Sequence, residues 1–128
     1  MFLAISTFNQ PSVLAAPTDV FATDGDNERV EEITRAYFSD VPVMAEIAWC
    51  ESKFKQFDER DGGVERGDVT SEDVGVMQVN EYFHKDVADS LGLDLHTLGG
   101  NLLYARYLYE KEGTKPWNSS KHCWKKRI

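Results

Sequence analysis

Hydrophobic residues recur every three or four positions along most of this chain, which predicts helices. The first helix is expected over residues 27–38, with Asp26 as its N-cap. Its hydrophobic stripe consists of Val30, Ile33 and Tyr37. A period close to 3.6 residues places these side chains on one face, and that face is expected to pack against the rest of the domain.

The second predicted helix carries a carboxylate on its hydrophobic stripe. Asp40, with Pro42 in the first turn, starts this helix, which is expected to fray near residues 54–57. The stripe is formed by Met44, Ile47 and Ala48, and Glu51 continues it at helical spacing. The carboxyl group of Glu51 therefore lies on the face that is directed toward the core.

A different pattern occupies the middle of the chain. Residues 58–70 are polar and rich in Gly and Asp, which indicates a loop or an irregular β region. Val74, Val76 and Val79 then give a short extended signal, too short for a large sheet. One small β element is therefore expected between helices.

Two further helices follow. Asn80 is expected to cap a helix over residues 81–90, and a long helix opens at Asp94 or Thr97 and stops before Gly113. The long helix is apolar around most of its circumference, which predicts a central position. The sequence thus predicts a mainly helical α+β domain over residues 26–128.

Charge and hydropathy narrow the class of partner. The net charge of −8 argues against nucleic-acid binding, because phosphate recognition needs a basic face. The segment 115–128 is basic and is expected to be a solvated end, the alternative being an anchor to wall polymers or acidic lipid. No stretch has the length of about 18 apolar residues that spans a bilayer.

Residues 1–25 are set apart from this domain. Met1–Ile5 is apolar, and Val13–Ala15 fits a small-residue cleavage site, but no basic residue precedes Arg29. We interpret residues 1–16 as the remnant of an export signal, with a disordered leader as the alternative.

The chain has two cysteines, Cys50 and Cys123. In a reducing cytosol they would be a buried and a surface thiol, whereas in an exported domain the even count predicts one disulfide, which we favour. Neither cysteine has a metal-ligand neighbour beyond His122, and the three histidines form no triad or metal spacing, so no metal or cofactor is expected.

Two carboxylates are the main candidates for chemistry. Burial of Glu51 disfavours its anion and suits it to act as a general acid, while Asp73 precedes Gly75, where a ligand or backbone can approach closely. An acid beside an anion is what glycosidic-bond cleavage requires. Alternatively, Glu51 is a helix-end glutamate facing solvent and Asp73 caps its own turn.

Other polar and aromatic residues are weaker candidates. Gln78 lies on the strand face opposite Met77 and Val79, where its amide can bind a sugar hydroxyl or face water. Four aromatic residues can stack on sugar rings or belong to the core: Tyr104, Tyr107, Trp117 and Trp124.

Together these residues resemble the lysozyme-like superfamily, in particular its transglycosylase SLT branch. Glu51-Ser52 at a helix end, followed by Gly75-Val76-Met77-Gln78, is similar to the motif pair of that branch. Ser71, Asp73, Gly75, Gln78 and Asn80 fall where animal lysozymes carry Ser-x-Asp-x-Gly-x-x-Gln-x-Asn. Cys50-Glu51-Ser52 with Trp117 and Cys123 resembles the secreted resuscitation-promoting factors, which bridge these two cysteines.

The resemblance implies a lysozyme-like fold and cleavage of the β-1,4 bond between N-acetylmuramic acid and N-acetylglucosamine in peptidoglycan. Glu51 would be the general acid and base, and Asp73 the second carboxylate. Ser52, Gln78 and Asn80 would position the glycan or the acid. A monomeric extracytoplasmic enzyme acting on glycan strands is expected, without a cofactor. Two carboxyl groups with different pKa values are a known property of lysozyme, and their assignment to Glu51 and Asp73 follows from the resemblance.

The chain departs from the SLT pattern in two ways. It lacks the Tyr-Asn-Ala-Gly segment whose tyrosine orients the acid, and Pro116–Ser120 stands roughly in its place. Asp73 is also untypical of SLT domains. The expectation is therefore a lytic transglycosylase, with a hydrolytic muramidase or a non-catalytic wall-binding module as alternatives.

Overall fold

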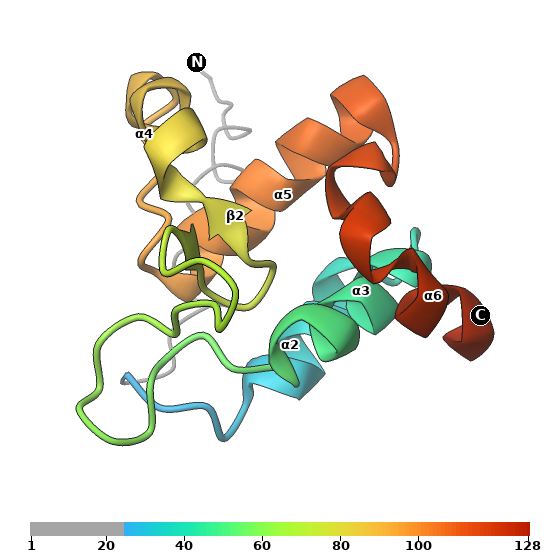
Figure 1. Ribbon diagram of the computed structural model, residues 1–128, viewed down its shortest axis with the longest axis horizontal. Coiled ribbons are helices and arrows are strands. Elements are labelled where there is room, and N and C mark those ends of the chain that lie inside the picture. The colour runs from blue at the N-terminus through green and yellow to red at the C-terminus, as the bar shows by residue number, and fades with distance from the viewer. Residues whose placement is uncertain (1–24) are drawn as a thin grey trace, which may run out of the picture.

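The computed structural model describes residues 25–128 and has the predicted mainly helical α+β architecture (Figure 1). Within these residues, five α-helices and two short 3₁₀-helices accompany one two-stranded antiparallel hairpin. The hairpin lies between helices in the chain, as predicted. The export-signal interpretation of residues 1–16 lies outside the described residues.

The first helix, α2 (Val30–Tyr37), begins later than the predicted residue 27. The difference arises because Asn27 has another partner. Its side-chain oxygen accepts hydrogen bonds from the backbone N–H groups of Gln56 and Phe57, each at 3.0 Å. Asn27 therefore fastens the start of the domain to the loop after the second helix.

The second helix, α3 (Val43–Ser52), ends abruptly, where fraying over residues 54–57 was predicted. Lys53 and Phe54 both adopt left-handed backbone conformations, with φ of 56° and 61°. The Ser52 hydroxyl stabilises this turn by accepting from the Lys55 N–H at 3.1 Å. It also donates to the carbonyl of Val76 at 2.8 Å, which joins the helix end to the hairpin.

The hairpin consists of β1 (Asp73–Val74) and β2 (Val79–Asn80), with Asp73 opposite Asn80. The turn between the strands is buried and contains Gly75, with φ of 77°. A Cβ atom at Gly75 would collide with the side-chain amide of Asn101 and would lie 2.7 Å from the side-chain oxygen of Gln56. The close approach expected at this glycine is therefore made by two buried amides of the protein.

Helices α4 (Glu81–Ser90) and α5 (Leu98–Glu112) confirm the predicted caps. The Asn80 side chain accepts from the Phe83 N–H, and the Thr97 side chain accepts from the Gly100 N–H. α5 lies between α4 and the C-terminal segment in Figure 1. Its central position agrees with the burial of the side chains that form its packing face: Leu98, Leu102, Tyr104, Ala105 and Leu108.

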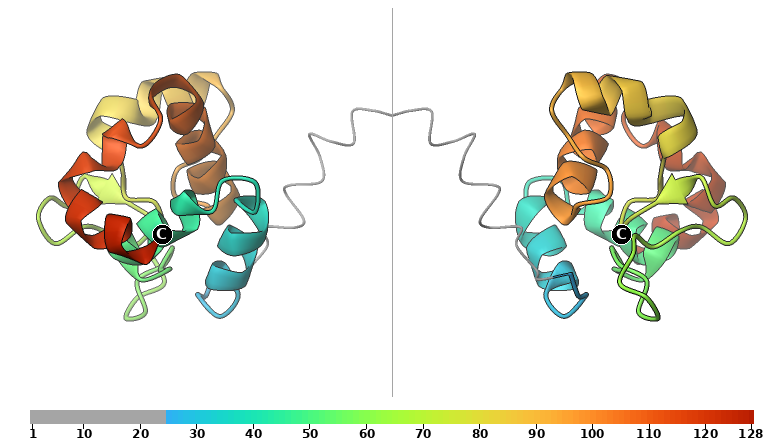
Figure 2. Two further views of the ribbon diagram at one scale, coloured as in Figure 1. Left: turned by 90° about the vertical axis from the view of Figure 1, so that its right-hand side faces the viewer. Right: turned by 90° about the vertical axis from the view of Figure 1, so that its left-hand side faces the viewer.

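The C-terminal segment differs from the solvated end that its charge predicted. It forms η1 (Lys115–Ser120), α6 (Lys121–Trp124) and η2 (Lys125–Arg127). Trp117 and Trp124 are buried in the core, while the lysines remain exposed. α6 packs against α3, and the two lie side by side in both views of Figure 2. These helices are too short to produce a periodic signal in the sequence.

The predicted disulfide joins Cys50 of α3 to Cys123 of α6, with the Cα atoms 6.0 Å apart. It closes a loop whose ends are 73 residues apart. Structural disulfides are typical of proteins that fold outside the reducing cytosol. In the described part of the chain, no helix has the length and hydropathy required to cross a membrane.

Candidate active site

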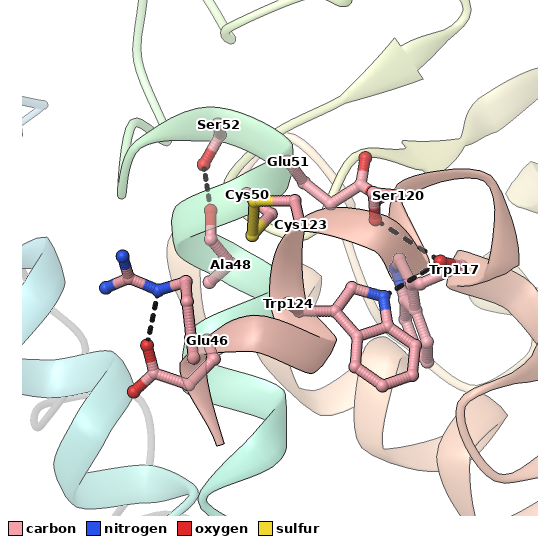
Figure 3. The surroundings of a disulfide bond; sticks show 10 residues. Glu46, Ala48, Cys50, Glu51, Ser52, Trp117, Ser120, Cys123 and Trp124 are labelled. Atoms are coloured by element: carbon pink, nitrogen blue, oxygen red, sulfur yellow. Dashed lines mark hydrogen bonds and ion pairs between the residues drawn. A yellow bond between two sulfur atoms is a disulfide. The ribbon is translucent and has the colours of Figure 1, made fainter.

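Glu51 lies in the last turn of α3, beside the disulfide. The stripe that was predicted to direct it inward is present, since Met44, Ile47 and Ala48 are fully buried. The carboxylate is half-buried, and its Oε2 accepts a hydrogen bond of 2.6 Å from the Ser120 hydroxyl (Figure 3). The C-terminal segment therefore contacts the candidate acid directly.

The pKa of Glu51 is raised above the ordinary value for a glutamate. Burial is the main cause, because it disfavours the charged form. The hydrogen bond from Ser120 opposes this shift, and the negative charge of Asp73 adds to it. A carboxyl group with a raised pKa retains its proton at higher pH and is suited to act as a general acid.

Asp73 reaches the same region from the hairpin. Because Asp73 and Asn80 are cross-strand partners, the Asn80 side-chain amide can donate to Asp73 Oδ1, at 3.1 Å. The pKa of Asp73 is also raised, first by burial and further by the charge of Glu72, against the hydrogen bond from Asn80. Glu51 and Asp73 thus form a pair of carboxylates that interact electrostatically.

The two carboxylates line one small cleft of about 110 Å³. Of the predicted binding residues, Gln78, Asn80 and Trp117 also line it. The pocket is much smaller than those of about 300–1,000 Å³ that enclose small ligands. It can therefore surround reacting atoms, while most of a long substrate would lie outside it.

Two other predicted residues do not reach the cleft. Ser52 is buried, and its hydroxyl contacts backbone atoms of Ala48, Lys55 and Val76. Its role in the structure is to hold the end of α3, and hence Glu51, against the hairpin. Tyr104 is 1% exposed, so its ring offers no face for stacking on a sugar.

Several cleft residues were not anticipated. The cleft is also lined by His84, Pro116 and Ser119. His84 Nδ1 lies 3.0 Å from the Tyr104 hydroxyl, and burial lowers its pKa, which favours the neutral imidazole. The sequence contains one signal for His84: it lies one helical turn beyond the cap Asn80, on the same side of α4.

Two buried side-chain amides bind the backbone of the hairpin turn that carries part of the site. Gln56 and Asn101 are both fully buried, and their side-chain oxygens accept from the N–H groups of Val76 and Met77, at 2.8 and 2.9 Å. Neither residue was predicted from the sequence. Asn101 had a detectable signal, because it is a polar residue on the hydrophobic face of the long helix.

Larger hollows of 520–540 Å³ lie elsewhere on the described surface, but they resemble the candidate site less. They are open to solvent. Glu81, which lines one of them, is ion-paired with Arg66 at 2.8 Å and hydrogen-bonded to His96 at 2.6 Å. Glu65 lines another, and burial raises its pKa while the charge of Lys55 opposes the shift. We therefore place the candidate chemistry at Glu51. In the described part of the chain, no group of three or more His, Cys, Asp or Glu side chains could hold a metal ion.

No protein-family model, curated protein or solved structure matches this chain. The residues of the cleft and the motif resemblance carried by Glu51-Ser52 and Gly75–Gln78 are therefore the indications of its function.

Proposed function

We propose that this protein is a lytic transglycosylase with a lysozyme-like fold, and that it cleaves the β-1,4 bond between N-acetylmuramic acid and N-acetylglucosamine in peptidoglycan. One observation carries the proposal: Glu51 is a desolvated carboxyl group with a raised pKa, and it lines one cleft together with a second carboxylate, Asp73. The motifs around both residues supply the substrate class by resemblance.

In this reaction Glu51 donates its proton to the glycosidic oxygen as the bond to the anomeric carbon breaks. The ionised Glu51 then accepts the proton of the muramyl 6-hydroxyl, whose oxygen bonds to the anomeric carbon and closes a 1,6-anhydro ring. One carboxyl group performs both proton transfers, so its two charge states must both be accessible near the working pH.

The size of the cleft is consistent with a polymeric substrate. A volume of about 110 Å³ leaves room around the scissile bond only. Gln78, in the turn of the hairpin, and Asn80, at the end of β2, both line the cleft, where their amides can hold sugar substituents. The remaining sugar units would bind along the surface on either side.

A muramidase is the second candidate, and the position of Asp73 favours it. Asp73 lines the cleft with Glu51, where an anion can offset the positive charge that develops at the anomeric carbon. Water would then complete the reaction and leave a reducing end.

A non-catalytic wall-binding module is the rival from another class. It would use the same cleft to hold glycan without turnover. The desolvation of Glu51 argues against a pure binding module. Burying a carboxylate costs free energy, and a protein that only binds glycan gains nothing from a raised pKa. For all three proposed functions the protein binds glycan strands outside the cytoplasm, in agreement with its disulfide.

The test is mass spectrometry of the soluble products released from purified sacculi by the wild-type protein and by two variants. Glu51→Gln keeps the shape of the side chain but cannot donate a proton, so product release should fall by about 10²–10⁴-fold. Glu110→Gln is the matched control, since it makes the same change at an exposed position of α5 outside the cleft. Anhydromuramyl products identify the transglycosylase. Retained glycan binding without products from the wild type would instead support the binding module.

A further inference from the structure

The Ser120 hydroxyl is the only hydrogen-bond donor to the Glu51 carboxylate within residues 25–128, at 2.6 Å. The two residues are 69 positions apart and belong to different segments, η1 and α3. Ser120 ends the segment Pro116–Ser120, which lacks the Tyr-Asn-Ala-Gly sequence of the SLT pattern. The contact of its hydroxyl with the candidate acid is therefore known from the structure and not from a motif.

The Ser120 hydroxyl has two acceptors within reach but only one proton. They are Glu51 Oε2 at 2.6 Å and the backbone carbonyl of Trp117 at 3.2 Å. When Glu51 is ionised, the serine proton points to the carboxylate. When Glu51 is protonated, its own proton can point to the serine oxygen, and the serine proton can turn to the Trp117 carbonyl. Each charge state of the acid thus has a hydrogen-bonded partner.

Three contacts hold the segment that carries Ser120, and Figure 3 shows two of them, the Trp124–Trp117 hydrogen bond and the disulfide. The Trp117 carbonyl also accepts from the indole N–H of Trp124 at 3.0 Å, and the Trp117 indole donates to the Met77 carbonyl at 2.9 Å. Three residues after Ser120, Cys123 is bonded to Cys50, the neighbour of Glu51. The segment is therefore anchored to both the hairpin and α3.

We propose that Ser120 is the positioning residue of Glu51, and that its hydroxyl turns between the carboxylate and the Trp117 carbonyl as Glu51 loses and regains its proton. The inference rests on the proposed function, in which Glu51 is acid and then base. It assigns to the C-terminal segment the orienting role for which the chain has no Tyr-Asn-Ala-Gly tyrosine.

The groups around Glu51 make the effect of this hydroxyl measurable. The other titratable side chains that line the cleft are Asp73 from the hairpin and His84 from α4. Asp73 raises the pKa of Glu51, and Ser120 provides the hydrogen bond that lowers it. Removal of the hydroxyl should therefore raise the pKa of Glu51 further, whereas a general loss of stability should not.

The experiment compares Ser120→Ala, Ser120→Thr and Ser90→Ala with the wild type. Ser90→Ala is the matched control, because it removes a hydroxyl that donates to the backbone of α4 away from the cleft. The pKa of Glu51 is measured by carbon-13 NMR titration of its carboxyl group, assigned with Glu51→Gln. The pH profile of sacculus cleavage is recorded for the same four proteins.

In Ser120→Ala, we expect the pKa of Glu51 to rise, the alkaline limb of the activity profile to move to higher pH, and kcat to fall about tenfold with little change in KM. Ser120→Thr should restore the pKa of Glu51, the alkaline limb and kcat, and Ser90→Ala should match the wild type. An unchanged Glu51 titration in Ser120→Ala, or no recovery in Ser120→Thr, would overturn the inference. If the wild type releases no products, the proposed function fails, while the titration still measures whether Ser120 controls the carboxyl group.

Discussion

The side-chain oxygen of Asn101, on α5, accepts a hydrogen bond of 2.9 Å from the backbone N–H of Met77, in the turn of the hairpin. Its amide group also donates to the carbonyls of Val74 and Leu95, at 3.0 and 2.9 Å. One fully buried side chain thus satisfies three backbone groups and fixes the hairpin to the central helix. Because Asp73 and Gln78 belong to this hairpin and its turn, Asn101 determines where they lie relative to α5.

We expect Asn101→Leu to destabilise the protein by about 2–4 kcal/mol, because leucine has a similar volume but cannot replace these hydrogen bonds. The Met77 N–H and the Val74 carbonyl lose their side-chain partner, and the Leu95 carbonyl keeps only the longer hydrogen bond from Gln56, at 3.3 Å. Urea unfolding followed by tryptophan fluorescence measures the loss. Asn118→Leu makes the same change at an exposed position and should have little effect. Equal stability of the two variants would show that the buried hydrogen bonds of Asn101 are dispensable.

The helices of the middle of the chain were predictable because local rules determined them. Asn80, Thr97 and Gly113 are helix-boundary residues whose effects depend on neighbours within a few positions, and the structure uses all three as predicted. The disulfide was also predicted, since the chain offers one pairing.

The parts that the sequence did not reveal depend on contacts between distant segments. Asparagine is common at helix starts, but the side chain of Asn27 binds a loop about thirty positions away. The serine that contacts Glu51 lies in a 3₁₀-helix of six residues, which has no periodic signal. The positive charge of the C-terminal segment predicted a solvated tail. The side chains of Trp117 and Trp124 are instead buried in the core and attach the segment to it.

The raised pKa of Glu51 predicts a stability effect with a definite sign. A carboxyl group whose pKa is higher in the folded state than in the unfolded state favours folding at low pH, and this contribution is lost as the pH rises through the folded pKa. Glu51→Gln should therefore raise the melting temperature at pH 7 relative to the wild type. The difference should shrink below the unfolded pKa, which is about 4.3.

Glu46, on the same helix, should behave in the opposite way. Burial tends to raise its pKa, but hydrogen bonds from Arg35 and Arg127 outweigh burial and hold the pKa of Glu46 below its ordinary value. The anion of Glu46 stabilises the fold at neutral pH, and this stability is lost as the pH falls through the folded pKa. Calorimetry of Glu46→Gln at pH 7 should show a lower melting temperature. The same sign for both variants would contradict the assigned shifts.

The Cys50–Cys123 disulfide should contribute to both stability and the arrangement of the site. In the chain-entropy treatment, closing a loop of this length stabilises the fold by about 4 kcal/mol. Cys50→Ser with Cys123→Ser should therefore melt at a lower temperature than the wild type and release fewer products from sacculi, because α6 holds the segment with Ser120 near Glu51.

A reducing agent provides the matched comparison for the disulfide. It should lower the melting temperature of the wild type and leave that of the double variant unchanged. Non-reducing peptide mapping of the native protein should recover the two cysteines in one linked pair of peptides. Recovery of both as free thiols would contradict the disulfide.

Asp73→Asn distinguishes the two proposed reactions. Asparagine keeps a side-chain oxygen that can accept from the Asn80 amide, so the hairpin contact survives while the charge is lost. If water is the acceptor, this charge offsets the developing cation, and its removal should slow cleavage by about 100-fold or more. If the muramyl 6-hydroxyl is the acceptor, Glu51 performs both proton transfers, and the substitution should reduce cleavage little beyond any loss of substrate affinity.

We expect the second result, with anhydromuramyl products. Asp86→Asn makes the same substitution at an exposed position of α4 outside the cleft lining, so it is the control and should cleave at the wild-type rate. Products with reducing ends, together with a large loss in Asp73→Asn alone, would identify the protein as a muramidase.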